Sequence, residues 1–347
     1  MLYNRNMKFL KRLIVFLISI VLVVFNLSCG VNYSQINFTC FETGINIVVD
    51  KTISKTTETE IKNYLFNLEE QSSVNLSTSL ISQYNNLAVN KAPNLSNELK
   101  EILGVCKKVY SLTNGGFDPT IFPLVKLWQF NAGTYKNPNF IPPTIEQIVS
   151  ALSNVGFDKI QDLTYVKSSM VEIDLGGALK GYAAEKVGNM LINKGVKKGY
   201  INVGSSSLYI IESNTLGIVH PRNNSSVILT LNQKIKNTAV STSGDYERFY
   251  QYDNERYSHI INAKTGMPAN TGVVSATVLG ESGAETDAIS TALCTYSKQE
   301  LINFVSLNGD NYKIIAVYLN GQEKQIITNF SSSSFTLHDS SYTFLQV

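Results

Sequence analysis

The sequence has few cysteines and no excess of charge of either sign. Four Cys in 347 residues cannot form the dense disulfide framework of a small secreted scaffold, so a hydrophobic core must supply the stability. Lys and Arg number 29 against 27 Asp and Glu, and this balance argues against a nucleic-acid partner, because phosphate binding requires a dense basic face. Collagen-like, coiled-coil and wholly disordered chains are excluded as well. Beyond the leader, Cys40, Cys106 and Cys294 are predicted to be buried free thiols.

Internal repeats and long low-complexity stretches are also lacking, and no inter-domain linker is visible before the Ser-rich residues 331–334. Residues 41–347 are therefore predicted to form a single globular domain. Residues 1–28 differ in composition from this domain and are interpreted as a signal peptide of the lipoprotein type. Residues 29–40 are interpreted as a tether between the two.

The leader combines a basic segment with a short apolar run. Residues 13–25 suit the core of a signal peptide, but the run is shorter than the about 20 residues of a spanning helix. Residues 27–30 resemble the bacterial lipobox, in which the cysteine, here Cys29, becomes the lipidated first residue. Asn26 stands where that pattern usually has an aliphatic residue, and an uncleaved anchor or a cleaved secreted form are the alternatives. The basic residues are Arg5, Lys8, Lys11 and Arg12.

Hydrophobic periodicity and breaker residues predict helices mixed irregularly with strands. Asn94 or Ser96 is expected to cap the second helix, and Thr144 the third. Because strict βαβ alternation is missing, the pattern favours an α+β fold. The predicted helices are 58–68, 97–112, 145–153, 178–193, 285–296 and 298–307. The predicted strands are 45–50, 170–175, 199–203, 207–211, 227–231, 257–261, 273–279 and 313–319.

Two glycine-containing segments follow or precede predicted helices. Residues 115–120, Gly-Gly-Phe-Asp-Pro-Thr, either end a helix with a simple glycine cap or form part of a site. Residues 174–181 place two glycines and Lys180 at the start of a helix, where free N–H groups and the helix dipole can hold an anion. A tight connection is the alternative, since neither GxxxxGK[ST] nor GxGxxG is present.

Two further segments carry proton-transfer and metal-binding side-chain types. His259 lies in a predicted strand, where it is either a satisfied structural residue or a proton acceptor with a pKa near 6.5. Asp287 and Thr291 are four residues apart on a predicted helix, so their oxygens share one face. One carboxylate and one hydroxyl suit a hard cation such as Mg²⁺ that also binds substrate phosphates. The alternative is an ordinary acid near a helix start and a packing threonine.

Taken in order, these segments resemble the ApbE family of FAD-dependent flavin transferases (FAD:protein FMN transferases). The resemblance runs from about Phe41 to Val317 and includes residues 116–120, 174–183, 241–248, 257–261 and 287–292. It implies a two-lobed α+β fold with mixed, largely antiparallel sheets, related to the T-fold. FAD would bind between the lobes with Mg²⁺ on its pyrophosphate. Family members transfer FMN from FAD to a Thr or Ser hydroxyl of a target protein and release AMP.

The resemblance also implies roles for individual residues. His259 would be the general base, and Lys180 would help the metal to neutralise the pyrophosphate. Gly177 would give its carbonyl, and Asp287 and Thr291 their side chains, to the metal. The residues implied to contact FAD are Phe41, Gly116, Phe117, Asp118, Asp174, Lys180, His259 and Ile260.

The sequence departs from the family pattern in two places. Ser206 replaces the acid of the usual AsnxGlyGlyAsp motif, and Asn262-Ala263 replaces the usual AspPro. Neither change removes His259 or a metal ligand, so activity is expected to survive. An FAD pyrophosphatase giving FMN and AMP, or a non-catalytic flavin-binding lipoprotein, are the alternatives. The expected location is the extracytoplasmic face of the cell membrane, with a membrane or extracellular flavoprotein as acceptor.

A first prediction concerns lipid attachment at Cys29. The residue directly follows the apolar run, so the Cys29→Ser variant should lose the lipid that the wild-type chain carries. Metabolic labelling with a fatty acid, followed by gel analysis, measures this. Equal labelling of the two chains would contradict the prediction.

Overall fold

The computed structural model describes residues 33–131 and 136–347. The leader and Cys29 lie outside the described residues. The strands are β1 (Ser34–Cys40), β2 (Thr43–Val49), β3 (Gly199–Val203), β4 (Ser207–Ser213), β5 (Leu216–His220), β6 (Asn223–Leu231), β7 (Ile235–Gly244), β8 (Phe249–Tyr252), β9 (Glu255–Ser258), β10 (Val273–Gly280), β11 (Lys313–Asn320), β12 (Glu323–Thr328), β13 (Phe335–Leu337) and β14 (Thr343–Gln346). The helices are α2 (Lys55–Ser72), α3 (Leu80–Asn85), α4 (Asn97–Leu112), α5 (Phe122–Leu127), α6 (Ile145–Leu152), α7 (Leu179–Asn193), α8 (Gly283–Leu293) and α9 (Lys298–Asn308).

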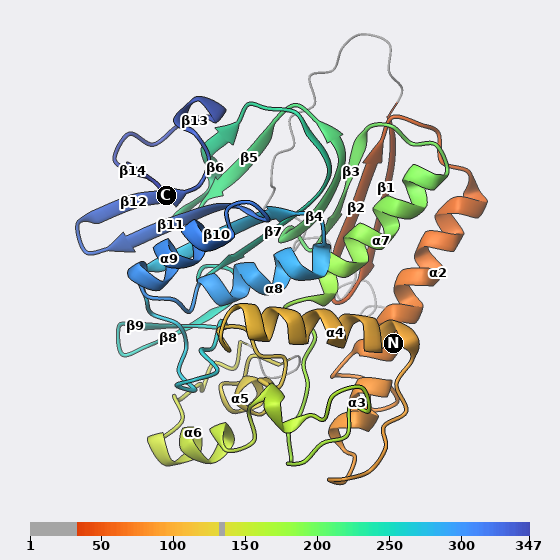
Figure 1. The fold of residues 1–347 in the computed structure, drawn as a ribbon, viewed down its shortest axis with the longest axis vertical. Coiled ribbons are helices and arrows are strands. Elements are labelled where there is room, and N and C mark those ends of the chain that lie inside the picture. Colours follow the sequence, from red (N-terminus) through yellow and green to blue (C-terminus); the bar gives the residue numbers. More distant parts are fainter. Residues whose placement is uncertain (1–32, 132–135) are drawn as a thin grey trace, which may run out of the picture.

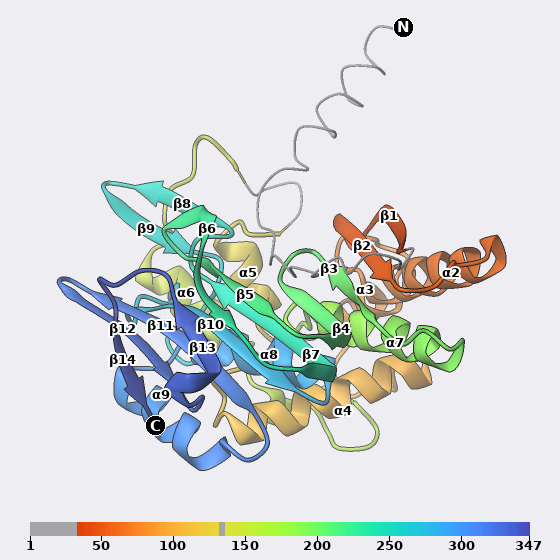
Figure 2. The ribbon, with the colours of Figure 1, turned by 90° about the horizontal axis from the view of Figure 1, so that it is seen from above.

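A large central sheet organises the described part of the chain. Its strand order is β1-β2-β3-β4-β7-β10-β11-β12-β14, and every neighbouring pair is antiparallel except β12 with β14. Helices α7 and α8 pack on one face of this sheet, and α4 packs along α8 (Figures 1 and 2). The prediction of an α+β fold with largely antiparallel sheets is confirmed.

Side chains of the central strands are buried on both faces of the sheet. On β4, Tyr209 and Ile211 join the core under the helices, whereas Leu208 and Ile210 join a second core. The small sheet β13-β6-β5 closes that second core with side chains such as Leu229. Burial on both faces explains why these strands read as nearly continuous apolar runs. A third core, in which aromatic and aliphatic side chains pack together, lies around α5, α6 and the β8–β9 hairpin.

Local signals predicted the starts of α4 and α6 correctly. The predicted starts at residues 58 and 285 were wrong, because α2 begins at Lys55 and α8 at Gly283. The Ser96 hydroxyl accepts from the backbone N–H of Leu99 at the start of α4. Thr144 and Gln147 form a reciprocal capping box at the start of α6. The three cysteines of the described chain are buried free thiols, as predicted.

Several sequence predictions about segment boundaries were wrong. Residues 34–40 of the predicted tether form β1, which pairs with β2 in full antiparallel register. Residues 170–175 form no strand beyond an isolated bridge at Glu172. There the side chain of Asn85 bonds both the N–H and the C=O of Ile173 and takes the place of a neighbouring strand. The predicted strand at 257–261 ends at Ser258, as β9.

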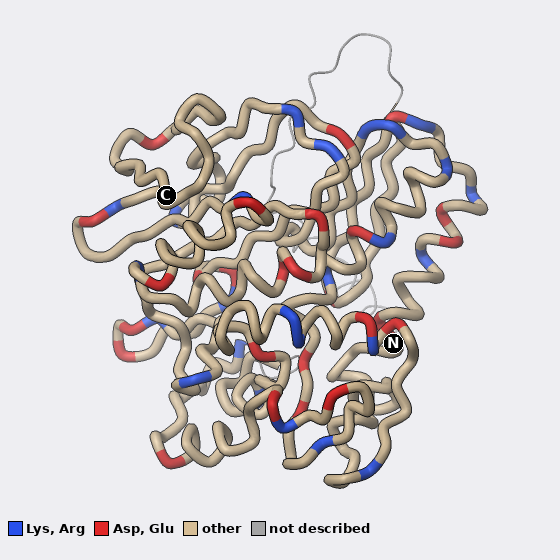
Figure 3. Tube along the Cα trace, viewed as in Figure 1, with Lys and Arg blue, Asp and Glu red and all other residues tan. Residues whose placement is uncertain are grey.

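Charged residues of both signs are interspersed along the Cα trace, as Figure 3 shows. Within the described residues, no helix is both long and apolar enough to cross a bilayer.

Helices α7 and α8 approach each other at a pair of glycines. A Cβ atom added at Gly181 would overlap the carbonyl oxygen of Gly283, and one added at Gly283 would overlap the carbonyl oxygen of Gly181. Side chains at either position would push the helices apart. This contact brings the N-terminal turn of α7 against the face of α8 that carries Asp287.

We predict that Gly181→Ala destabilises the protein by about 1–3 kcal/mol, the usual cost of overpacking a rigid contact. Urea unfolding should show a lower midpoint with an unchanged slope. Gly104→Ala on α4 is the matched control, because nothing lies within 4 Å of its added Cβ. The control should be neutral or stabilising by up to about 1 kcal/mol. Equal midpoints for the two variants would contradict the prediction.

Candidate active site

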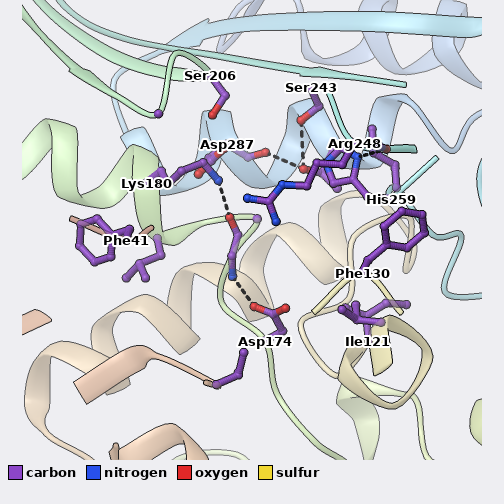
Figure 4. A pocket seen from close by; sticks show the side chains of 18 of the residues that line it. Phe41, Ile121, Phe130, Asp174, Lys180, Ser206, Ser243, Arg248, His259 and Asp287 are labelled. Carbon is purple, nitrogen blue, oxygen red and sulfur yellow. Dashed lines mark hydrogen bonds between the residues drawn. The ribbon is translucent and has the colours of Figure 1, made fainter. Parts of the chain in front are cut away.

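A cleft of about 320 Å³ lies where the β1–β2 turn, the start of α7, α8 and the base of the β8–β9 hairpin meet. Every predicted site residue within the described chain lines this cleft, and the close-up in Figure 4 labels several of them. The predicted residues in its wall are Phe41, Gly116, Phe117, Asp118, Asp174, Gly177, Lys180, His259, Ile260, Asp287 and Thr291. The predicted lipidation residue Cys29 lies outside the described residues.

The β1–β2 turn presents Phe41 to the cleft. Cys40 pairs with Thr43, so Phe41 and Glu42 are the two loop residues of a hairpin, with φ of 54° and 56°. Left-handed φ at both loop residues is the type I′ geometry that normally selects Asn and Gly, and a bulky residue there is strained. This strained conformation places the aromatic ring of Phe41 in the wall of the cleft.

The segment after α4 forms a rigid part of the wall. The helix α4 ends in a Schellman motif in which Asn114 (φ 49°) takes the left-handed position directly after the cap and Gly115 (φ 73°) follows it, so the predicted cap is present but begins at Asn114 and not at a glycine. Asp118 Oδ1 accepts from the N–H and the hydroxyl of Thr120 at 2.8 and 2.7 Å, and Oδ2 accepts from Phe157 N at 3.2 Å. Burial raises the pKa of Asp118 despite these bonds. The carboxylate therefore mainly holds the chain in shape.

The turn before α7 and the first turn of that helix bring the carboxyl group of Asp174 and the ammonium group of Lys180 to the cleft. Asp174 Oδ1 accepts from Gly176 N at 2.7 Å, and Lys180 Nζ donates to the carbonyl of Gly176 at 2.8 Å. Burial raises the pKa of Asp174. The N-cap residue Ala178 makes no side-chain bond to α7, and in the first turn the N–H groups of Leu179 and Gly181 are already bonded to Leu175 O and Asp287 Oδ2. The ammonium of Lys180 and the positive end of the helix dipole are therefore the features here that favour an anion.

Asp287 lies at the junction of α8, α7 and β4. The residue is 3 % exposed, its Oδ2 accepts from Gly181 N at 3.0 Å, and its Oδ1 accepts from the Ser207 hydroxyl at 3.2 Å. Each carboxylate oxygen can accept a further bond. Thr291, one turn later, lies near Gly177: a Cβ added at that glycine would be 3.5 Å from Thr291 Oγ1.

His259 sits just after β9, at the neck of the hairpin. Its backbone N–H and its Nδ1 are 2.9 and 3.2 Å from the carbonyl oxygen of Arg248. A carbonyl only accepts, so Nδ1 carries the proton and Nε2 keeps its lone pair. Burial, together with the charges of Arg248 and Lys180, lowers the pKa of His259 to about 3, well below the range that the sequence interpretation assumed.

Several cleft residues were not assigned by sequence reasoning. Glu247 lines the cleft. Burial raises its pKa to about 7, although the positive charges of Lys180 and Arg248 act to lower it. The adjacent charged pair Glu247-Arg248 lies within residues 241–248, so the motif itself was the available signal. Phe130 also lines the cleft, but it lies in a segment without any motif. Its ring is edge-on to the ring of His259, with 6.3 Å between the two ring centroids.

Comparisons with known proteins agree with this fold and cleft. The family model described as "ApbE family" matches residues 41–316. The FAD:protein FMN transferase of Vibrio cholerae is 28% identical over 262 residues, which cover 71% of this chain and 75% of that relative. The FAD:protein FMN transferase of Buchnera aphidicola is 27% identical over 226 residues, which cover 62% of this chain and 65% of that relative.

A solved structure extends the agreement to three dimensions. The crystal structure of the ApbE protein from Thermotoga maritima matches with a TM-score of 0.73 at 27% identity, over 83% of this chain and 94% of that one. The fold and the matched relatives define the chain as an enzyme. It belongs to the ApbE family, as the sequence predicted.

We predict that the His259 ring stays neutral from pH 8 down to about pH 4 in the free protein. Its lowered pKa, about 3, means that half-protonation of the ring is reached only below this range. NMR of ¹⁵N-labelled histidines measures the titration, and the His259→Gln variant identifies the signal. A midpoint near 6.5 for that signal would contradict the prediction.

Proposed function

We propose that this protein transfers FMN from FAD to a Thr or Ser hydroxyl of a target protein, with release of AMP and with Mg²⁺ as the metal. The observation that carries the proposal is the convergence of all described predicted residues on one cleft. The relatives named FAD:protein FMN transferase support the choice of reaction. FAD is accordingly a substrate, and the acceptor is a second protein.

The donor set at Asp287 fits a hard cation. A buried carboxylate with free lone pairs, the Thr291 hydroxyl and the Gly177 carbonyl are oxygen ligands of the kind that Mg²⁺ prefers. Across the described residues, His, Cys, Asp and Glu nowhere gather in groups of three that could hold a metal. Water and substrate phosphates would therefore complete the coordination, and the cation would neutralise phosphate charge during transfer.

Lys180 and Arg248 would receive the anionic part of FAD. Both line the cleft, and their positive charges both act on His259 and Glu247. The Lys180 ammonium is held by the Gly176 carbonyl at 2.8 Å, a neutral acceptor that a phosphate oxygen can replace at little cost. These cations would counter the charge that repels an incoming nucleophile.

His259 would take the proton of the attacking hydroxyl. The acceptor oxygen bonds the phosphorus of the FMN half, the bond from that phosphorus to the bridging oxygen breaks, and AMP leaves with the electron pair. The lone pair on Nε2 suits this role, because Arg248 O fixes the proton on Nδ1. Phosphate charge in the cleft would raise the lowered pKa of His259 toward the working range of a general base.

The proposal includes a location. Cys29 would carry a lipid that holds the enzyme at the extracytoplasmic face of the cell membrane, where membrane or extracellular flavoproteins would be its acceptors. The signal-like composition of residues 1–28 supports this part of the proposal.

Incubation with FAD, Mg²⁺ and a Thr-containing acceptor protein tests the function by mass spectrometry. Transfer adds one FMN to the acceptor and releases AMP. AMP release with an unmodified acceptor would instead indicate an FAD pyrophosphatase, and FAD binding without AMP would indicate a flavin carrier. His259→Ala should slow transfer by about 10²- to 10⁴-fold while FAD affinity changes far less.

We predict that Asp287 makes FAD binding depend on Mg²⁺. The Asp287→Asn variant keeps an oxygen to accept from Gly181 N but loses the charge that holds a cation. Wild type should bind FAD more tightly with Mg²⁺ than with EDTA, and the variant should show no difference. Fluorescence titration of FAD measures both.

Thr291→Val is the matched control for Asp287→Asn. It replaces the hydroxyl, a neutral metal ligand in the proposal, by a methyl group of nearly the same size. Its affinity for FAD should retain part of the response to Mg²⁺. An Asp287→Asn protein that still gains affinity from Mg²⁺ would place the metal at another acid, of which Glu285 is the nearest in sequence.

A further inference from the structure

The side chain of Ser206 is buried and unpartnered in the wall of the cleft. The residue is 5 % exposed, and its hydroxyl has no hydrogen-bond partner. Within the described chain the hydroxyl of Ser275 and an oxygen of Gln325 share this state, but neither residue lines the cleft. A buried hydroxyl without a partner is unfavourable unless something else supplies one.

The backbone around Ser206 is fixed from both sides. Thr242 N donates to the Ser206 carbonyl at 2.8 Å, and Gly204 N donates to the Gly44 carbonyl at 3.0 Å. Ser205, at φ 63°, donates its N–H to Asn202 Oδ1 at 3.0 Å. With the backbone held in this way, rotation about the Cα–Cβ bond is the remaining freedom of the Ser206 side chain.

The neighbours of Ser206 are the charged groups that would hold a pyrophosphate. A Cβ added at Gly204 would lie 3.3 Å from Cδ of Lys180, so the turn packs against the lysine stem. The next residue, Ser207, donates its hydroxyl to Asp287. Figure 4 shows the Ser206 side chain pointing toward Lys180 and Asp287.

We infer that the Ser206 hydroxyl donates a hydrogen bond to a pyrophosphate oxygen of FAD. This inference rests on the proposed function and adds a binding residue at the phosphate end of its substrate. A hydroxyl supplies a donor there without adding a second negative charge beside Asp287. In the free cleft the Ser206 hydroxyl makes no hydrogen bond, and in the complex the substrate would accept one. The free energy of this hydrogen bond would therefore add to the affinity for the substrate.

The Ser206→Ala variant tests the inference with two measurements: affinity for phosphate-containing ligands, which should fall, and melting temperature without ligand, which should not. Affinity for FAD, and for ADP as a pyrophosphate without flavin, should fall about ten-fold, the size of one hydrogen bond to a charged group. Affinity for riboflavin, which has no phosphate, should not change. Without ligand, the variant should melt at the same temperature as wild type or higher, because an unpartnered buried hydroxyl has been removed.

Ser275→Ala is the matched control, since it removes a buried serine hydroxyl outside the cleft. Its affinity for FAD should equal that of wild type. Unchanged FAD affinity in Ser206→Ala would overturn this inference alone and leave the proposed function standing. Equal weakening for riboflavin and FAD would also overturn it, since the contact would not be to phosphate. A wild-type chain that does not bind FAD would overturn both.

Discussion

The buried carboxylate of Asp287 joins the elements on which the cleft depends. It accepts from the first turn of α7 and from β4 while its own helix, α8, lies against the central sheet. The contact exists because Gly181 and Gly283 let the two helices meet without side chains between them. The hydrogen bonds offset part of the cost of burying the charge, and lone pairs remain for a cation. The group that joins these elements is therefore also the proposed metal ligand.

The electrostatics of the free cleft disfavour isolated charges of either sign. Burial raises the pKa values of Asp118, Asp174 and Glu247, and burial with nearby cations lowers that of His259. An environment of this kind gains most when a cation and an anionic substrate enter together, because each then compensates the other. The metal-bound dinucleotide of the proposed function would meet this condition.

Local signals predicted much of the fold, and the failures have a common cause. The caps at Ser96 and Thr144 were correct because a cap depends only on the next few residues. Residues 170–175 look like a strand, but Asn85, distant in sequence, satisfies their backbone. The residues of β1 look like a tether until β2 pairs with them. Pairing partners far along the chain cannot be read from a short window.

The sequence by itself determined the family and the residue types of the site, because the motifs around Gly116, Asp174, His259 and Asp287 occur in a recognisable order. Only the tertiary structure brought them to one cleft. It alone decided that Asp118 accepts three hydrogen bonds, from Thr120 and Phe157, and that the pKa of His259 is low. It also left the Ser206 hydroxyl without a partner. These properties depend on burial and on contacts between distant segments, and neither is written in the local order of residues.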